Sequence, residues 1–450
     1  MESLDRRNFL KTGAGAVAIN AAGPMVKKAL AKKSPNEKIN VAVMGIRSRG
    51  RAHIRHLLSI PNVNVTKICD IDERLFPVVL EEMEKNGVKK LPKTETDIRR
   101  LLDDKKIDVV SIASPNHWHS LAAIWAIQAG KDVYVEKPVS HNIYEGRKIV
   151  EAARTYNRIV QTGSQRRSDP LMQAAVEFIQ SGQLGKIYMT KAVVYRARNS
   201  IGHGTVTQTP EGVHYDLFRG PAPWRPFNEN RFHYNWHWFW DTGNGETGNN
   251  GPHPVDIFRW ALNMYDHPRK IQSMGGFYSY DSEQETPNTQ LSVYEYPDGT
   301  ILQLEVRNLF TNRDDDIREG LIFYGTEGWM KFNLGNTWTT YMGRQNEPGP
   351  SMTREEANEK FGVRIMYGKG REPHFDNFIN CVRSRKREDL KADILEGHLS
   401  ASICHLGNIA YRVGRTVFFD SESESFIGDE VAQNYVSRDY REPFVVPDKV

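Results

Sequence analysis

The segment at 130–138, with the sequence GKDVYVEKP, carries the residue whose type and position point most clearly to chemistry. Val133, Tyr134 and Val135 predict a buried strand, and the sequence Glu-Lys-Pro follows it directly. Strands in this part of the chain alternate with helices, which predicts a parallel sheet, and ligands bind at the carboxyl ends of such strands. A lysine after a strand is often only a surface residue. Fixed between a strand and a proline, Lys137 is nevertheless a candidate catalytic ammonium group in a crevice.

A glycine loop follows the first predicted strand at 39–44. Its sequence, GIRSRG, precedes apolar residues at helical spacing, which is where a dinucleotide fingerprint puts pyrophosphate on a helix N-terminus. Arg47 stands where the second glycine is usual, so the backbone approaches the phosphates less closely, and an arginine can compensate by charge pairing. The residues expected to bind the cofactor here are Gly45, Arg47, Ser48, Arg49 and Gly50.

Two further predicted strands end in polar residues. The strand at 63–69 is followed by Asp70, near the separation expected for the carboxylate that binds the adenosine ribose, and an acid there favours NAD over NADP. The strand at 108–113 runs into the sequence SPNHWH, where we expect Ser114, Asn116 and His119 to contact the cofactor. Glu136 and Lys137 are expected to join them. The two histidines of this turn lack further ligands at metal spacing, so no metal site is predicted.

Composition indicates a globular chain of about two or three domains. Of the 450 residues, 26% are charged and 10% aromatic, and the net charge is +4. Residues 1–31 hold five basic and two acidic residues, a net of +3, so the remainder carries only +1. That balance leaves no basic field for nucleic acid or acidic lipid. Three scattered cysteines do not form a disulfide framework, and no stretch is apolar enough for a stable membrane span.

The first 31 residues predict an export signal. Arg6 and Arg7 precede a mildly apolar stretch of small residues at 12–26, and Ala-Leu-Ala at 29–31 offers a small-x-small cleavage site. This pattern is typical of a twin-arginine signal, and a frayed basic N-terminus is the alternative. The twin-arginine route carries folded proteins, which suits a protein that acquires its cofactor before export. We therefore expect a periplasmic or otherwise exported protein.

The order of these motifs resembles the Gfo/Idh/MocA oxidoreductases, named for glucose–fructose oxidoreductase and inositol dehydrogenase. The resemblance continues through the sequence QRRSDP at 165–170 and covers nearly all of the chain after the signal. It implies catalysis by Lys137 and a second α/β domain after the nucleotide domain. In this family an acid and a histidine, four residues apart, face the nicotinamide. His253 matches the histidine, but Asn249 stands where the acid is expected. The amide of Asn249 can orient a hydroxyl at the catalytic centre but cannot take a proton, so acid–base work would fall to His253 and Lys137.

The chain beyond 163 predicts an α+β domain. Residues 198–230 are rich in Gly, Pro, Thr and Asn, which indicates a long surface loop near the site. The aromatic run at 232–241 can stack on sugar rings, with His237 and Asp241 binding hydroxyls, or can belong to the core. The residues expected to bind substrate are Arg167, Trp236 and His237.

Repeated strand-like runs at 271–335 predict a sheet with helices on one face. Residues 336–372 are expected to form an irregular insertion, and helices at 374–383 and 392–412 to pack back on the first domain. The expected fold class is α/β, with an NAD-binding Rossmann domain at 38–162. An α+β domain for substrate binding and oligomerisation at 163–450 would contain a large, mostly antiparallel, open-faced sheet.

Three functions fit these patterns. The first is an NAD(P)-dependent oxidoreductase acting on a secondary alcohol of a sugar, glycoside or cyclitol, with NAD tightly bound because an exported enzyme cannot readily exchange it. The second uses the same cofactor for net glycoside hydrolysis through transient oxidation, elimination and reduction. The third is a non-catalytic binder of sugar or nucleotide, which the presence of both Lys137 and His253 disfavours. The expected partners are a small carbohydrate and further copies of the chain in a dimer or tetramer.

Overall fold

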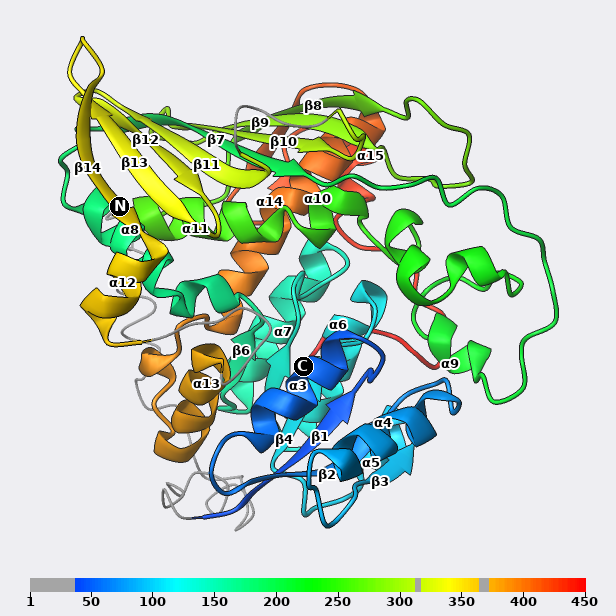
Figure 1. Ribbon diagram of the computed structural model, residues 1–450. Coiled ribbons are helices and arrows are strands. Elements are labelled where there is room, and N and C mark those ends of the chain that lie inside the picture. The colour runs from blue at the N-terminus through cyan, green and yellow to red at the C-terminus, as the bar shows by residue number, and fades with distance from the viewer. Residues whose placement is uncertain (1–36, 312–316, 364–371) are drawn as a thin grey trace, which may run out of the picture.

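The computed structural model describes residues 37–311, 317–363 and 372–450 and contains two sheets with helices between them (Figure 1). The expected export signal at 1–31 lies outside the described residues. None of the helices in the described part of the chain combines the length and the apolar character needed to cross a membrane.

The first sheet is parallel throughout, with the strand order β3-β2-β1-β4-β5-β6. Its strands are β1 (Ile39–Met44), β2 (Val63–Cys69), β3 (Lys93–Glu95), β4 (Val109–Ile112), β5 (Asp132–Val135) and β6 (Val160–Thr162). The helices that connect them are α3 (Arg49–Leu58), α4 (Leu75–Lys85), α5 (Ile98–Leu102), α6 (Asn116–Gln128) and α7 (Ile143–Thr155). Every residue of β4 and β5 is buried, as expected for central strands of a sheet that is covered on both faces. This is the predicted Rossmann arrangement.

The second sheet has ten strands in the order β14-β13-β12-β11-β7-β10-β9-β8-β15-β16. All neighbouring pairs are antiparallel except β7 with β10, so the predicted mostly antiparallel sheet is confirmed. The strands are β7 (Ile187–Tyr195), β8 (Lys270–Gly276), β9 (Thr289–Glu295), β10 (Ile301–Arg307), β11 (Glu319–Gly325), β12 (Gly328–Asn333), β13 (Thr337–Met342), β14 (Glu347–Thr353), β15 (Val417–Asp420) and β16 (Ser425–Phe426).

Helices lie beneath this sheet and join it to the first one (Figure 1). They are α8 (Pro170–Gln180), α10 (Gly245–Asn249), α11 (Pro252–Leu262), α12 (Arg354–Phe361), α13 (Pro373–Ser384), α14 (Ile394–Val413) and α15 (Glu430–Gln433), with α9 (Tyr215–Arg219) at the side of the molecule. Short 3₁₀ turns span Gln165–Ser168, Glu229–Arg231, His233–Trp238 and Arg387–Asp389. The apolar sides of α8, α11 and α14 share one core with the inner face of the sheet.

Two expectations about the C-terminal half have different outcomes. The expectation of an irregular insertion at 336–372 is wrong for most of that range, because β13, β14 and α12 form there. The helix α12 starts at a capping box in which Thr353 and Glu356 satisfy each other's backbone N–H groups. By contrast, α13 does pack back on the first sheet, where Phe375 and Phe378 contact Tyr134 of β5.

Candidate active site

A cavity of about 370 Å³ lies at the carboxyl ends of the parallel strands and is closed from the other side by the second domain. Lys137 and His253, which are 116 positions apart in the sequence, both line it, together with Asp70. A larger cavity of about 730 Å³ lies between α3, α4 and the start of α13, but neither Lys137 nor His253 borders it. The two residues that the sequence singles out for catalysis, Lys137 and His253, therefore both border the smaller cavity.

The glycine loop forms one wall of this cavity, and its shape suits a dinucleotide. Gly45 has a φ of +81°, and a Cβ there would lie 2.6 Å from the carbonyl oxygen of Ala113. Arg47, Ser48 and Arg49 line the cavity as expected. Ser48, the N-cap of α3, makes no side-chain cap, which leaves the first N–H groups of the helix for an anionic ligand.

Gly50 does not line the cavity. A Cβ at this position would lie 1.7 Å from the carbonyl oxygen of Gly45, so Gly50 permits the loop to fold back on its own helix. Its expected contact with the cofactor is thus replaced by a packing role, which is the third-glycine role in such loops.

Asp70 lies at the end of β2 and lines the cavity where an adenosine ribose would lie in a Rossmann domain. Its carboxylate accepts the backbone N–H groups of Ile46 at 2.8 Å and of Asp72 at 3.1 Å. Burial raises the pKa of Asp70 to about 6 despite these bonds. The two contacts fix the carboxylate beside the glycine loop.

Glu136 joins the glycine helix to the end of β5. Its carboxylate accepts hydrogen bonds from Arg49 Nε at 2.7 Å and from His53 Nε2 at 3.0 Å. Burial alone would raise the pKa of Glu136, but Arg49 and His53 outweigh it and hold that pKa well below the ordinary value. Gly163 makes room for this group, since a Cβ there would lie 2.8 Å from the carboxylate.

Lys137 extends from β5 towards the second domain. Its ammonium group donates a hydrogen bond to the backbone carbonyl of Asn249 at 2.5 Å, and burial lowers its pKa. Asn249 ends α10 and His253 lies in the first turn of α11, so the two residues line the same cavity from successive helices rather than from one helical face. Burial and the nearby Lys137 hold the pKa of His253 well below its usual value, so its imidazole is neutral and keeps a ring-nitrogen lone pair, while the same shift makes it a weaker base than a free imidazole.

The SPNHWH turn supports the floor of the cavity. Ser114, Asn116 and His119 all line it. The ring of His119 lies 2.7 Å from the Ser114 carbonyl and 2.6 Å from the Pro138 carbonyl, so it ties this turn to the one that carries Lys137. Asn116 donates to Asn244 of the second domain at 2.9 Å.

The aromatic run contributes directly to the cavity. Trp236 and His237 line it, with their rings stacked at 3.6 Å between centroids. His237 Nδ1 donates to the Tyr234 carbonyl at 2.6 Å, and burial lowers the pKa of His237 to about 3. Its Nε2 therefore carries a lone pair and can accept a hydroxyl proton in a hydrogen bond.

Two residues expected to bind substrate, Arg167 and Asp241, instead form ion pairs with other side chains. Arg167 is buried, with its guanidinium donating to Asp256 at 2.8 and 2.9 Å and to Glu396 at 3.0 Å, and it does not line the cavity. Asp241 pairs with Arg219 at 2.6 Å and Arg225 at 2.8 Å. Both expectations were wrong, because a charged side chain near a motif can be consumed by a structural ion pair that its sequence position does not reveal.

Other lining residues were not singled out from the sequence. Phe232, His233 and Tyr234 border the cavity, and His233 also contacts Asp72 at 3.1 Å. The aromatic composition of 232–241 was the available signal for the first three. Asp72, which contacts His233 but does not itself line the cavity, carried no comparable signal, since a second acid after a strand is common in loops.

Comparisons with known proteins agree with this geometry. Residues 39–164 match the family model described as "Oxidoreductase family, NAD-binding Rossmann fold", and residues 191–318 and 364–446 match "Oxidoreductase family, C-terminal alpha/beta domain". Both models are those of one family, and together they cover most of the chain. The protein belongs to the Gfo/Idh/MocA oxidoreductases.

Curated relatives share only part of their sequence with this chain. A "Glycosyl hydrolase family 109 protein" of Shewanella pealeana is 29% identical over 170 residues, which is 33% of this chain and 37% of that relative. The matched region thus spans well under half of the relative's length.

Solved structures resemble the fold over more of the chain. The WlbA dehydrogenase from Bordetella pertussis, in complex with NADH and UDP-GlcNAcA, has a TM-score of 0.62 at 20% identity and covers 86% of this chain and 99% of its own. Levoglucosan dehydrogenase in complex with NADH has a TM-score of 0.64 at 16% identity, covering 85% and 99%. At these identities the likeness shows the shared fold.

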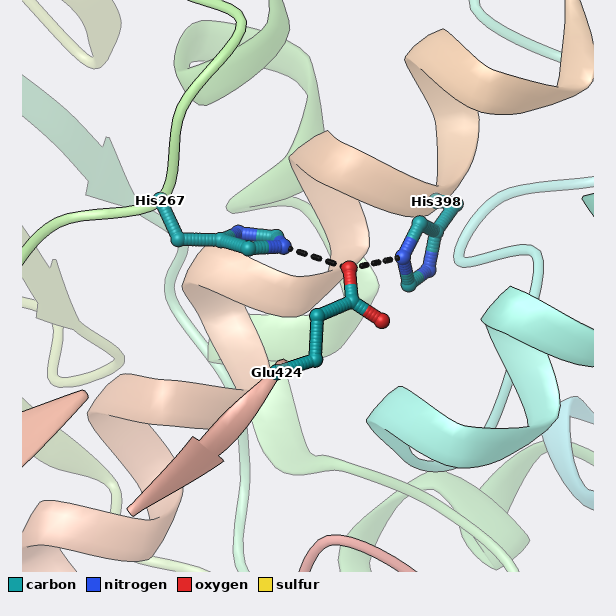
Figure 2. A group of neighbouring side chains, drawn as sticks. All are labelled: His267, His398 and Glu424. Atoms are coloured by element: carbon teal, nitrogen blue, oxygen red, sulfur yellow. Dashed lines mark hydrogen bonds and ion pairs between the residues drawn. The ribbon is translucent and has the colours of Figure 1, made fainter. Parts of the chain in front are cut away.

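One cluster in this Gfo/Idh/MocA protein has the residue types of a metal site. Within the described residues, His267, His398 and Glu424 bring possible ligand atoms within 4.8 Å of one another (Figure 2). Both Nε2 atoms lie 2.8 Å from Glu424 Oε1, and Arg147 donates to both carboxylate oxygens. The arginine already balances the carboxylate charge, so a divalent ion would add uncompensated buried charge. The cluster is better suited to joining segments than to binding a metal.

Proposed function

We propose that this protein is an NAD-dependent oxidoreductase that transfers hydride between the nicotinamide and the carbinol carbon of a secondary alcohol in a sugar, glycoside or cyclitol, which becomes a carbonyl when oxidised. The observation that carries this proposal is the position of Lys137 and His253 in one cavity beside a dinucleotide-type glycine loop. Structures with this fold contain NADH together with UDP-GlcNAcA or levoglucosan, which supports the cofactor and the carbohydrate class.

The residues of the cavity divide the chemistry between them. The nicotinamide would supply the hydride acceptor. His253, neutral because its pKa is lowered, accepts the proton of the substrate hydroxyl. Lys137 donates a hydrogen bond to the same oxygen as negative charge develops on it. Trp236 and His237 offer a stacking face and a hydroxyl acceptor for the sugar ring.

We propose NAD rather than NADP as the cofactor. Asp70 gives an acidic character to the adenosine end of the cavity, which repels a 2′-phosphate. Arg74 is held by Asp72 through contacts of 2.7 and 2.8 Å, so this cation is already paired. Denaturing the purified protein and identifying the released nucleotide by mass spectrometry tests the choice: NAD or NADH supports it, and NADP contradicts it.

The reaction itself is tested with a panel of sugars, glycosides and cyclitols. We expect at least one to change the nicotinamide absorbance of the protein, and Lys137→Met to abolish that change. Nucleotide or sugar binding without any hydride transfer across the panel would instead favour a non-catalytic binder.

A second candidate is an NAD-dependent glycosidase. The relative named as a glycosyl hydrolase of family 109 favours it, because the same cavity residues could oxidise a sugar, permit elimination of the glycoside and reduce the product. Release of an aglycone without net NADH, lost when the nucleotide is removed, would support this candidate over simple dehydrogenation.

We also propose export by the twin-arginine route and assembly into a dimer or tetramer. The paired Arg6 and Arg7 support export, and the exposed apolar side chains of Tyr188, Met274 and Phe418 on the ten-stranded sheet support assembly. Fractionation of cells producing the wild type and the Arg6→Lys/Arg7→Lys variant tests export, since only the wild type should reach the periplasm. Light scattering after gel filtration tests assembly, and a monomer mass would contradict it.

A further inference from the structure

A third cavity, of about 520 Å³, adjoins the candidate active site. Apart from Arg47, the residues that line it come from two segments, at 201–207 and 228–235. Both segments belong to the connection between β7 and α10, which runs along the side of the molecule that carries α9 (Figure 1). We call this space the outer cavity. Lys137 and His253 do not border it, so it is separate from the reacting centre.

A row of rings joins the reacting centre to the outer cavity. Burial and, to a smaller extent, the charge of Lys137 lower the pKa of His237, so these two side chains lie near each other. The ring of His237 lies 4.6 Å from that of Tyr234 between centroids. The residues that border both cavities are Arg47, Phe232, His233 and Tyr234. A carbohydrate bound at Lys137 can therefore continue across the Tyr234 ring into the outer cavity.

Hydrogen bonds fix the two walls of the outer cavity relative to each other. The carboxylate of Glu283 accepts the backbone N–H of Gly204 at 2.9 Å from one wall and the side-chain amide of Asn230 at 2.8 Å from the other. Val206 and Asn228 form an antiparallel bridge between the same walls. The cavity is therefore preorganised, which reduces the ordering cost of binding a ligand there.

Neutral hydrogen-bonding groups dominate the lining of the outer cavity. They are the side chains of Thr205, Thr207, Asn228, Asn230 and Asn235. The amide of Asn235 donates to Asn230 Oδ1 at 3.0 Å, which leaves the carboxamide oxygen of Asn235 as an acceptor for a hydroxyl group. Amides and hydroxyls of this kind suit a ligand that carries many hydroxyl groups.

The charges at the outer cavity nearly cancel. Arg47 and Glu229 both line it and have opposite signs. Burial and the charge of Arg47 lower the pKa of His233 to about 4, so this histidine is neutral at pH 7. His203 is exposed, and its Nε2 lies 3.0 Å from the carboxylate of Asp281. Such a lining favours an uncharged ligand over a phosphate or carboxylate, which would need a surplus of cations.

We infer that the outer cavity binds a second, uncharged sugar ring, so that the substrate is a disaccharide or a longer glycan rather than a free monosaccharide. The ring to be oxidised would lie at Lys137 and His253, while the linked ring would stack on Tyr234 and bond to Asn235. Because the outer edge of the cavity is exposed, further rings can extend into solvent. This inference rests on the proposed oxidoreductase function and names its substrate class.

Filling the outer cavity without touching the active-site cavity tests the inference. Thr205 is exposed and borders only the outer cavity, so Thr205→Trp should place an indole ring where the second sugar would bind. Thr209→Trp is the matched control, because Thr209 is an exposed residue of the same connection that borders neither cavity. Asn235→Ala, which removes one hydroxyl acceptor and adds no bulk, is a second variant.

The measured quantity is the ratio of kcat/KM for a disaccharide to kcat/KM for its own monosaccharide. The probes are the α- and β-linked disaccharides of glucose, galactose and mannose, in which both rings match the monosaccharide. For the wild type we expect a ratio of about ten or more for at least one pair. Thr205→Trp should lower that ratio about tenfold and Asn235→Ala about fivefold, as for one lost hydrogen bond, while Thr209→Trp should leave it within about twofold. A wild-type ratio near one, or the same loss in both tryptophan variants, would overturn the inference.

Binding measurements separate this inference from the proposed function. Calorimetry gives the affinity of the protein, supplied with NAD, for the same sugars without requiring turnover. If disaccharides bind more tightly than monosaccharides in the wild type but not in Thr205→Trp, and no hydride is transferred, the outer cavity binds a sugar and the proposed oxidoreductase function fails. If monosaccharides and disaccharides are oxidised equally well, the function stands and the outer cavity is not a sugar site. A preference for sugar nucleotides or uronic acids that Thr205→Trp abolishes would contradict the uncharged ring.

Discussion

Glu136 and Glu424 are both buried carboxylates held by one arginine and by histidine, but only Glu136 borders the cavity that contains Lys137. Burial opposes ionisation of both, yet their cationic and hydrogen-bonding neighbours hold both pKa values below the ordinary one. Glu136 follows β5, where the ends of parallel strands open a crevice. Glu424 is enclosed by α7, α14 and the segment before β8 (Figure 2).

The difference shows that residue types do not by themselves make a site. The same combination of Glu, Arg and His borders the candidate active site when a cavity reaches it and joins chain segments when packing encloses it. Perturbed pKa values occur in both settings, so they are informative only together with access. Variants at the two glutamates and at their neighbours should separate these two roles.

The largest effect is expected at Lys137, the neighbour that Glu136 has and Glu424 lacks. Lys137→Met should lower kcat/KM by about 10³-fold, the range for loss of an acid–base or charge-stabilising group, and leave Tm nearly unchanged. Lys131→Met is the matched control, because this buried lysine of the same segment donates only to the carbonyls of Asp104 and Ile107. The control should lose stability and keep its activity; the opposite pattern would remove Lys137 from the mechanism.

The enclosed glutamate should affect stability alone. Glu424→Gln is expected to lower the free energy of unfolding by about 2 kcal/mol, less than for a fully enclosed ion pair, since Arg147 is partly exposed. Urea denaturation measures this loss, and kcat of the folded fraction should change less than about twofold. Glu136→Gln should lower both stability and kcat, so equal kcat losses in the two variants would contradict the contrast.

Acid should weaken the enclosed cluster. Burial lowers the pKa of His398 to about 4, below the value of about 6.5 in an unfolded chain. A lowered folded pKa means that this contribution to stability is complete above about pH 6.5 and declines as the pH falls towards 4. Unfolding free energy should therefore drop by about 1 kcal/mol for this histidine between pH 7.5 and 5.5. Urea titrations should show a smaller drop in His398→Asn; an identical drop would contradict the assignment.

A smaller effect is expected where the cavity departs from the family pattern. Asn249→Asp places a carboxylate near His253 and Lys137, which should raise the pKa of His253. We expect the acid limb of the kcat/KM profile to move upward by about one pH unit. Asn249→Ala should leave the pH of the acid limb unchanged. If Asn249→Asp also leaves the acid limb unchanged, His253 is excluded as the titrating base.

The smallest effect is expected from metal removal. Because Arg147 already neutralises Glu424, dialysis against EDTA should change neither Tm nor activity, and elemental analysis should find no stoichiometric metal. A clear decrease in Tm on dialysis that zinc restores would instead show that the enclosed cluster binds a metal ion.

The sequence could predict features that depend on short stretches of chain. The apolar run before Glu136 predicts a central parallel strand, and Gly45 at the end of β1 predicts the loop, because strand burial and turn geometry are local. The ion pairs that occupy Arg167 could not be predicted in this way. Its partners Asp256 and Glu396 are distant in sequence, and only packing of α11 and α14 against the turn before α8 brings them together.

Periodicity and motif spacing act over a few residues, so the sequence was enough to predict the parallel sheet, the mostly antiparallel character of the second sheet, the glycine loop and the residue types of the candidate catalytic pair. The folded arrangement was needed to show that Lys137 and His253 line one cavity, that Glu424 is enclosed, and that part of the aromatic run at 232–237 borders the same cavity. The physical reason is that charge, hydrogen bonding and access act through space. Their outcome depends on which distant segments the folded chain places within a few ångströms.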